Sequence, residues 1–560
     1  MNKWTRKPEL SELTLEEKIS QLLLLRQGHL TNVVDGDPRP KTKEQRDALM
    51  RTNHFGGLWS YGRVKMENAN LAEEGTRVSV AEQKELMDEA QGNVKIPLLV
   101  GVDCENGAGY TFLDGTKVGT AAMIGAADDE ELTFRLNAAV AREIKASGAN
   151  WRWGPIVDTR GRFSPGCTRS FSDNPDKIIK HAIAAMRGTQ SEKVAATIKH
   201  FPGQDIYNFR DSHLTSTHLT YTLEDWKKGQ GRIFQALIDA GASSMMSTHI
   251  SFPAVDDEME NGKYVPSTLS KKIIQGLLRD QMGYDGVLIT DAIMMAAVTN
   301  YCSHEEILIR AINAGHDMLL GVAPDDFQIV HQAVLDGKIP MERIDESCRR
   351  ILKLKEEIGL FEAESESIDI KQQAPLTAQI NEMLAKKSVT LLYDHNDLLP
   401  VSREKVRKVA IIATSHMKSF ADDLVVMKAE FEKRGAETHI YAQPFEGGSK
   451  TLRRIEKEYD LLIYAGYIAM HQPLGLPSLY GDQAGLFFSA FRGGVEKTIG
   501  ISMGYPYLHF DMMTGARTFV NTYSQSPECQ KAFVSAIYGE IPFEGVSPFD
   551  VEPKLRLIYC

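Results

Sequence analysis

Gly286-Val-Leu-Ile-Thr290 is a short apolar run that leads into the carboxylate of Asp291, and Ala292-Ile-Met-Met-Ala296 follows directly. A run of about four to eight residues of this kind is typical of a buried strand in a parallel sheet. The stretch after it is helix-like in composition. In an α/β barrel the active site gathers at the C-terminal ends of the strands. Asp291 therefore stands where such a barrel would hold a catalytic nucleophile.

Similar apolar runs alternate with amphipathic segments through the first part of the chain, which is the pattern of βα units around a parallel sheet. We expect strands over His54–Ser60, Ile96–Asp103, Asn150–Asp158, Ala195–Phe201, Ala242–His249, Val287–Asp291 and Asp317–Val322. Most of these runs end at or next to a polar residue. Seven units are close to the eight of a closed TIM-like (β/α)8 barrel, so one strand is irregular or escapes the pattern.

The rest of the chain predicts a second domain. A helix over Met341–Ile358, with its apolar residues on one face, stops at Gly359 and ends a barrel domain of residues 1–360. An acidic linker is expected over 361–377, followed by an αβα sandwich over 378–560. Its five apolar runs predict five parallel strands, at 388–393, 408–414, 459–465, 497–503 and 518–523. No GxGxxG or P-loop supports nucleotide binding.

Composition narrows the class of protein. The 560 residues include 25% charged and 42% hydrophobic residues, which is ordinary for a globular protein of several domains. The net charge of −11 argues against a nucleic-acid or anionic-membrane partner, although a basic patch can hide in an acidic total. The six cysteines lie far apart, and the polar N-terminus lacks the apolar core of a secretory signal. We expect a cytoplasmic monomer or homodimer.

A possible acid–base pair follows one of the expected strands. Lys199-His200 lies near the end of that strand, and Phe201-Pro202-Gly203 breaks it, so residues 204–218 should form a loop over the barrel mouth. Asp211 and His213 are two residues apart and can hydrogen bond in an extended loop. A carboxylate fixes the tautomer of an imidazole and raises its basicity, which suits general acid–base catalysis. The alternative is a polar surface loop with incidental histidines.

Other polar residues could bind a substrate or a metal. Asp103 and Glu105 could accept hydrogen bonds from sugar hydroxyl groups, but a single acid of this kind more often caps a βα turn. Arg169 could donate to a substrate oxygen, although a single arginine is more often an ion-pair partner. Histidines near strand ends also permit a zinc site. The chain has no HExxH and no early HxH, so we expect no metal and no cofactor.

Several motifs occur in the same order in glycoside hydrolase family 3. They are Asp103-x-Glu105-x-Gly107, Lys199-His-Phe-Pro-Gly203, Asp211-x-His213 and Ile289-Thr-Asp291-Ala-Ile-x-Met295. Two further stretches agree, Trp153-Gly-Pro-Ile-Val-Asp158 with Thr168-Arg-Ser-Phe-Ser172, and Ala314-Gly-His-Asp-Met-Leu-Leu320. The second domain also resembles that of the family, notably at Lys387-Ser-Val-Thr-Leu-Leu392 and Arg517-Thr-Phe-Val-Asn-Thr-Tyr523. The chain resembles this family over nearly its whole length, and it looks most like the β-N-acetylglucosaminidase branch.

The resemblance implies a role for each matching residue. Asp291 would be the nucleophile that forms a covalent glycosyl-enzyme, and His213, oriented by Asp211, would be the general acid and then the general base. The sugar-binding positions of the family match Asp103, Arg169, Lys199 and His200. A retaining glycosidase needs one group to attack the anomeric carbon and another to protonate the leaving oxygen. These residues supply both.

The chain also departs from the family pattern. Asn106-Gly107-Ala108 stands where the family often has Gly-Gly-Arg, and Gln204-Asp205 stands where it often has His-Gly. We expect an exo-acting retaining β-N-acetylglucosaminidase that acts on a small β-linked amino-sugar compound. A β-glucosidase or a phosphorylase of the same fold is the alternative within the family. A sugar-binding protein without catalysis and a metal hydrolase are the alternatives from other classes.

Overall fold

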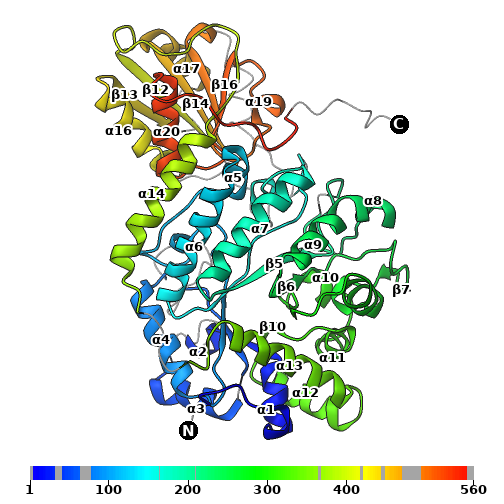
Figure 1. Cartoon of the computed structure of the whole chain (residues 1–560). Coiled ribbons are helices and arrows are strands. Elements are labelled where there is room, and N and C mark those ends of the chain that lie inside the picture. The colour runs from blue at the N-terminus through cyan, green and yellow to red at the C-terminus, as the bar shows by residue number, and fades with distance from the viewer. Residues whose placement is uncertain are drawn as a thin grey trace. The chain divides into compact units, whose positions relative to one another are not determined.

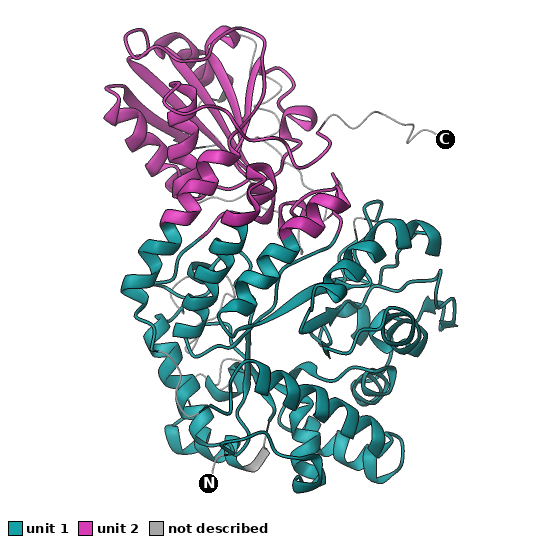
Figure 2. Ribbon diagram, viewed as in Figure 1, with its two compact units in different colours: residues 1–117, 133–158, 182–378 teal, residues 118–132, 159–181, 379–560 magenta. Residues whose placement is uncertain are grey.

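The computed structural model describes residues 4–31, 41–53, 55–62, 77–162, 164, 166–208, 210–362, 367–415, 420–442, 448–468 and 494–551. The chain forms two compact units (Figure 2). The first contains residues 1–117, 133–158 and 182–378, and the second contains 118–132, 159–181 and 379–560.

The first unit is built around a parallel sheet of eight strands, in the order β10-β1-β2-β3-β4-β5-β6-β9 (Figure 1). The strands are β1 (Leu23–Arg26), β2 (Gly57–Trp59), β3 (Leu99–Val102), β4 (Trp151–Arg152), β5 (Ala195–Phe201), β6 (Ser244–Ser247), β9 (Val287–Ile289) and β10 (Leu319–Val322). Ile289 pairs in parallel with Met318, just before β10, and this bridge closes the sheet. The expected TIM-like barrel is confirmed, and the strand that the pattern missed is β1.

Helices follow most strands of the barrel. They are α1 (Leu15–Gln21), α2 (Gly28–Thr31), α3 (Lys43–Asn53), α4 (Val80–Gly92), α6 (Glu130–Ala146), α7 (Pro175–Ser191), α8 (Leu223–Lys228), α9 (Gln230–Asp239), the π-helix η6 (Lys272–Gln281), α10 (Ala296–Thr299), α11 (His304–Ala314), α12 (Asp326–Leu335) and α13 (Met341–Glu357). A small hairpin, β7 (Met259–Glu260) and β8 (Lys263–Tyr264), follows β6. The helix expected over Met341–Ile358 is present as α13, and its apolar face is buried.

The second unit holds a six-stranded sheet in the order β11-β16-β15-β14-β12-β13. The strands are β11 (Thr390–Asp394), β12 (Lys408–Ser415), β13 (Glu437–Ala442), β14 (Leu461–Tyr467), β15 (Thr498–Ser502) and β16 (Thr518–Asn521). The helices are α5 (Ala121–Ala127), α14 (Ile370–Ser388), which begins in the first unit, α15 (Phe420–Asp423), α16 (Val425–Lys433), α17 (Gly448–Glu458), α19 (Leu508–Asp511) and α20 (Pro527–Ile537). The expectation of five parallel strands was wrong, because β13 is an additional strand and β11 runs antiparallel to β16.

The limits between the two parts differ from the expected ones. Residues 370–377, expected within a linker, form the first turns of α14. Two segments of the first 360 residues, 118–132 and 159–181, cluster with the second unit. No helix among the described residues is both long and apolar enough to cross a membrane.

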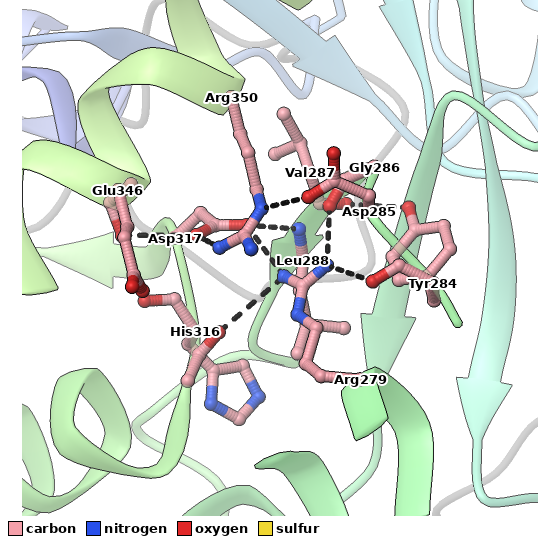
Figure 3. Close-up of polar contacts among 12 residues, drawn as sticks. Arg279, Tyr284, Asp285, Gly286, Val287, Leu288, His316, Asp317, Glu346 and Arg350 are labelled. Atoms are coloured by element: carbon pink, nitrogen blue, oxygen red, sulfur yellow. Dashed lines mark hydrogen bonds and ion pairs between the residues drawn. The ribbon is translucent and has the colours of Figure 1, made fainter. Parts of the chain in front are cut away.

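A buried charge cluster lies at the N-terminal ends of strands β9 and β10 (Figure 3). Asp317 lies just before β10 and is fully buried, and its carboxylate pairs with Arg279, Arg343 and Arg350 at 2.8, 2.6 and 3.3 Å. The backbone N–H of Leu288 in β9 donates to the same carboxylate at 3.0 Å. Burial raises the pKa of Asp317, but the three guanidinium groups and this N–H lower it by more. The net pKa is lowered, and the carboxylate stays ionised.

Asp317→Asn is expected to lower the free energy of unfolding by about 3–5 kcal/mol, because three arginines lose the anion between them. Asp285→Asn is the matched control, since Asp285 pairs with one of these arginines from an exposed position with its side chain 76% accessible. A change below about 1 kcal/mol is expected there. Urea unfolding of both variants measures the difference. Equal losses would show that burial of the cluster is not what stabilises this end of the barrel.

Lys355 in α13 is buried at the same end of the barrel. Its ammonium group donates to Gln21 Oε1 at 2.6 Å and to the carbonyl of Gly56 at 3.0 Å. Burial lowers the pKa of Lys355 to about 7. In the unfolded chain a lysine has a pKa of about 10.4. Between these two values the unfolded state binds more protons, so this residue makes the protein more stable as the pH rises.

The free energy of unfolding of the wild type, relative to that of Lys355→Met, is expected to rise between pH 7.5 and 9.5 by up to about 1.4 kcal/mol per pH unit. Lys353→Met, on the same helix with its side chain 60% exposed, should show no such slope. Denaturant unfolding at several pH values checks both. A pH-independent difference for Lys355→Met would contradict the lowered pKa.

Candidate active site

Polar side chains from four neighbouring strands and from β9 meet at the C-terminal end of the barrel. Asp103 follows β3, Asp158 follows β4, and Lys199-His200 lies near the end of β5. His249 and Asp291 follow β6 and β9. This is the placement that the pattern of strand ends predicts, and all of these residues belong to the first unit.

Lys199 carries a positive charge that two acids neutralise. Its side chain is 2% exposed, and Nζ lies 3.0 Å from Asp103 Oδ1 and 2.8 Å from Glu105 Oε1. Asp103 remains half exposed, with 51% of its side chain accessible. Lys199 thus holds the loop after β3 against the end of β5, while the free face of the Asp103 carboxylate is available to accept hydrogen bonds from hydroxyl groups.

His200 is oriented by a fully buried carboxylate. Asp158 Oδ2 lies 2.8 Å from His200 Nδ1, and Asp158 Oδ1 accepts the backbone N–H of His200 at 2.9 Å. An ionised carboxylate only accepts, so Nδ1 carries the proton and Nε2 is left for another partner. The pairing across two strands fixes the ring where the strands end.

His213 and Asp211 form the expected pair. Asp211 Oδ1 lies 2.7 Å from His213 Nδ1 and also accepts the backbone N–H of His213 at 2.9 Å. Asp211 is 3% exposed whereas the His213 ring is 38% exposed, so the pair presents Nε2 outward. The loop is tied to the segment after Asp291, because Ala296 N donates to His213 O at 3.3 Å and Ala297 N donates to Ser212 O at 3.1 Å.

Asp291 is held as an anion among histidines. Ala292 N donates to Asp291 Oδ1 at 2.7 Å, and the backbone N–H of Asp291 donates to Ser247 O at 3.1 Å. Burial raises the pKa of Asp291, but the nearby histidines His200, His249 and His213 lower it by more when charged. The net pKa is below the ordinary value. The carboxylate is therefore ionised at neutral pH.

His249 contacts the backbone next to Asp291. Its ring is buried, and burial lowers its pKa, so it is neutral at neutral pH. Nε2 lies 3.0 Å from the carbonyl of Ala292, which can only accept, so Nε2 carries the proton. Nδ1 lies 2.8 Å from Thr268 Oγ1. His249 thereby fixes the backbone directly after Asp291.

Two of these residues, Asp158 and His249, had no assigned catalytic or sugar-binding role in the sequence analysis. Both lie beyond strand ends, which was the signal that could have found them. Arg169 ends the short helix η4 (Cys167–Arg169), within a segment of the second unit, and its role in sugar binding stays a prediction. Among the residues that the structure describes, no three His, Cys, Asp or Glu side chains are grouped as a metal site requires.

Comparison with known proteins decides the family. The model of the glycosyl hydrolase family 3 N-terminal domain matches residues 14–354, which is more than half of the chain. The chain belongs to glycosyl hydrolase family 3. It is therefore a glycoside hydrolase, and the resemblance found from its motifs is confirmed.

The names of similar proteins give several activities. A β-N-acetylglucosaminidase/β-glucosidase of Cellulomonas fimi is 27% identical, over 98% of this chain and 95% of its own. The solved structure of β-glucoside phosphorylase BglX has a TM-score of 0.82 at 26% identity, over 98% of this chain and 95% of that one. A family 3 β-N-acetylglucosaminidase from Paenibacillus sp. str. FPU-7 has a TM-score of 0.80 at 25% identity, over 96% and 99%.

Proposed function

We propose that this protein is an exo-acting retaining β-N-acetylglucosaminidase that works through a glycosyl-Asp291 intermediate. One observation carries the proposal. The Asp211–His213 pair is hydrogen bonded, and its loop accepts backbone hydrogen bonds from Ala296 and Ala297 in the segment that follows Asp291. A nucleophile and an acid–base group are the two parts that a retaining glycosidase needs.

The proposed reaction has two steps. In the first, Asp291 attacks the anomeric carbon while protonated His213 gives its Nε2 proton to the leaving oxygen. Asp211 stabilises the imidazolium before the transfer and keeps Nδ1 protonated. In the second step, neutral His213 takes a proton from water as the water oxygen attacks the same carbon. The bond to Asp291 breaks, and its electron pair returns to the carboxylate.

The binding roles are proposed from the family resemblance, and part of the geometry supports them. The exposed side of Asp103 would accept from sugar hydroxyl groups, and His200 has Nε2 left for a substrate because Asp158 occupies Nδ1. Lys199 would donate to sugar oxygens, and for Arg169 the same role rests on the resemblance alone. The amino-sugar specificity rests on the relatives named β-N-acetylglucosaminidase. We also retain the cytoplasm as the expected location, since the five described cysteines are free thiols.

A phosphorylase is the second candidate, because the similar BglX structure is named as one. A neutral histidine base, unlike a carboxylate, does not repel an incoming anion such as phosphate. Parallel assays with 4-nitrophenyl β-N-acetylglucosaminide and β-glucoside, each with and without phosphate, separate the candidates. We expect the amino sugar to be preferred and free sugar to be released. A preference for the glucoside, or a sugar 1-phosphate as the main product, would contradict the proposal.

A further inference from the structure

Arg26, the last residue of β1, points into the barrel mouth. It is paired in register with Trp59 of β2, and Trp59 with Gly101 of β3, so these positions share one face of the sheet. That face is the inner one. A Cβ on Gly101 would lie 2.2 Å from the Trp153 ring, so Gly101 and Trp153 face the same side of the sheet. Arg152, the residue before Trp153, points to the opposite side, where it contacts Asn137 of the outer helix α6.

The side chain of Arg26 lies beside the segment that carries Asp291. A Cβ on Gly321 of β10 would lie 2.7 Å from Met294 Cε, 3.7 Å from the Trp59 ring and 3.9 Å from Arg26 Cδ. These three side chains therefore converge over Gly321. Met294 is three residues after Asp291, and Ile293 N, between them, donates to Leu320 O of β10 at 3.2 Å.

No residue that the structure describes neutralises the charge of Arg26. The Arg26 guanidinium forms no hydrogen bond and no ion pair with any residue that the structure describes. Its Nε is buried without an acceptor. The group lies 5.9 Å from the centre of the half-buried Trp59 ring. Lys199, a cation near the end of β5, differs in that two carboxylates hold it. A half-buried cation without an anion calls for an explanation.

Two indole groups next to Arg26 add further hydrogen-bond donors. The Trp59 and Trp153 rings are 5.9 Å apart, and both indole Nε1 atoms are buried without a partner in the described part of the chain. Arginine and tryptophan side chains donate but do not accept hydrogen bonds. A cluster of this composition is complementary to a group that only accepts and is negatively charged.

We propose that Arg26 binds an oxyanion, a carboxylate or phosphate group of the substrate or of the glycosyl acceptor, on the β1–β10 side of the catalytic mouth. The inference rests on the proposed function, because it places this anion beside the Asp291 segment. Its guanidinium offers two parallel N–H donors, the geometry that carboxylate and phosphate oxygens match best. The source of the oxyanion is either an anionic aglycone or free phosphate.

The first arm of the test compares two substrates of similar leaving-group chemistry. The N-acetylglucosaminides of 4-methylumbelliferone and of its 4-carboxymethyl analogue differ mainly in one carboxylate. If the oxyanion belongs to the aglycone, Arg26→Met is expected to lower kcat/KM for the anionic substrate, relative to kcat/KM for the neutral one, by about 10- to 100-fold. Arg26→Lys is expected to lower this ratio by less. Arg403→Met removes an exposed positive charge from the second unit and serves as the matched control.

The second arm uses inorganic phosphate. If phosphate is the oxyanion, sugar 1-phosphate forms in a phosphate-dependent manner with the wild type. Arg26→Met is then expected to raise the phosphate concentration for half-maximal formation by about 10-fold or more, with no change for Arg403→Met. The expected result in either arm supports the inference and identifies the source of the oxyanion.

The inference is overturned if Arg26→Met, folded by circular dichroism, keeps both the substrate ratio and the phosphate response of the wild type. Asp291→Asn separates this failure from a failure of the proposed function. If Asp291→Asn is inactive while Arg26→Met behaves like the wild type, only the oxyanion site is wrong. If Asp291→Asn is active, the proposed function fails first.

Discussion

Asp291→Asn is expected to lower kcat for 4-nitrophenyl β-N-acetylglucosaminide by at least about 10⁴-fold, because removal of a covalent nucleophile costs several orders of magnitude. The amide has nearly the same shape and its oxygen can still accept the N–H of Ala292, so the fold should be retained. Steady-state assays, with the melting temperature as a control for folding, measure the effect. Activity within 10-fold of the wild type would remove Asp291 from the mechanism.

His213→Gln should have the next largest effect, and its size should depend on the leaving group. An N-acetylglucosamine disaccharide releases a poor leaving group that needs a proton, so kcat/KM should fall by about 10²- to 10⁴-fold. Nitrophenolate leaves without a proton, so kcat/KM for the nitrophenyl substrate should change little. Its kcat should still fall, because the second step loses its base. Asp211→Asn is expected to act in the same direction with a smaller effect.

His218→Gln is the matched control for His213. His218 lies in the same loop and packs its ring 5.7 Å from the Tyr264 ring, away from the acid–base pair. Both substrates should keep nearly the wild-type rates with this variant. Equal losses of kcat/KM on the disaccharide and on the nitrophenyl substrate with His213→Gln would contradict proton transfer by His213.

The barrel could be predicted because its strands are short apolar runs between turn signals. β1 was missed because Leu22–Leu25 follows the amphipathic helix α1 without a break, so the run reads as its continuation. β13 was missed because it has only one fully buried residue and reads as a polar segment. The antiparallel direction of β11 depends on its pairing with β16, which local sequence does not encode.

The hydrogen-bonded Asp211–His213 pair and the position of Asp291 after a strand could be predicted because local spacing carries them. Asp211 and His213 are two residues apart, and Asp291 directly follows an apolar run. The pairs His200–Asp158 and Lys199–Glu105 join residues on different strands, so they arise only when the barrel closes. The unpaired charge of Arg26 was invisible for the same reason, and β1 itself had not been recognised.

Mass spectrometry after reaction with a 2-deoxy-2-fluoro or 5-fluoro glycosyl trap tests the central claim most directly. The account predicts that intact protein gains the mass of one glycosyl group, and that the modified peptide carries the sugar on Asp291. The adduct should be absent from Asp291→Asn. Turnover of the trap without any adduct, or an adduct on a different residue, would contradict the assignment of Asp291 as the nucleophile.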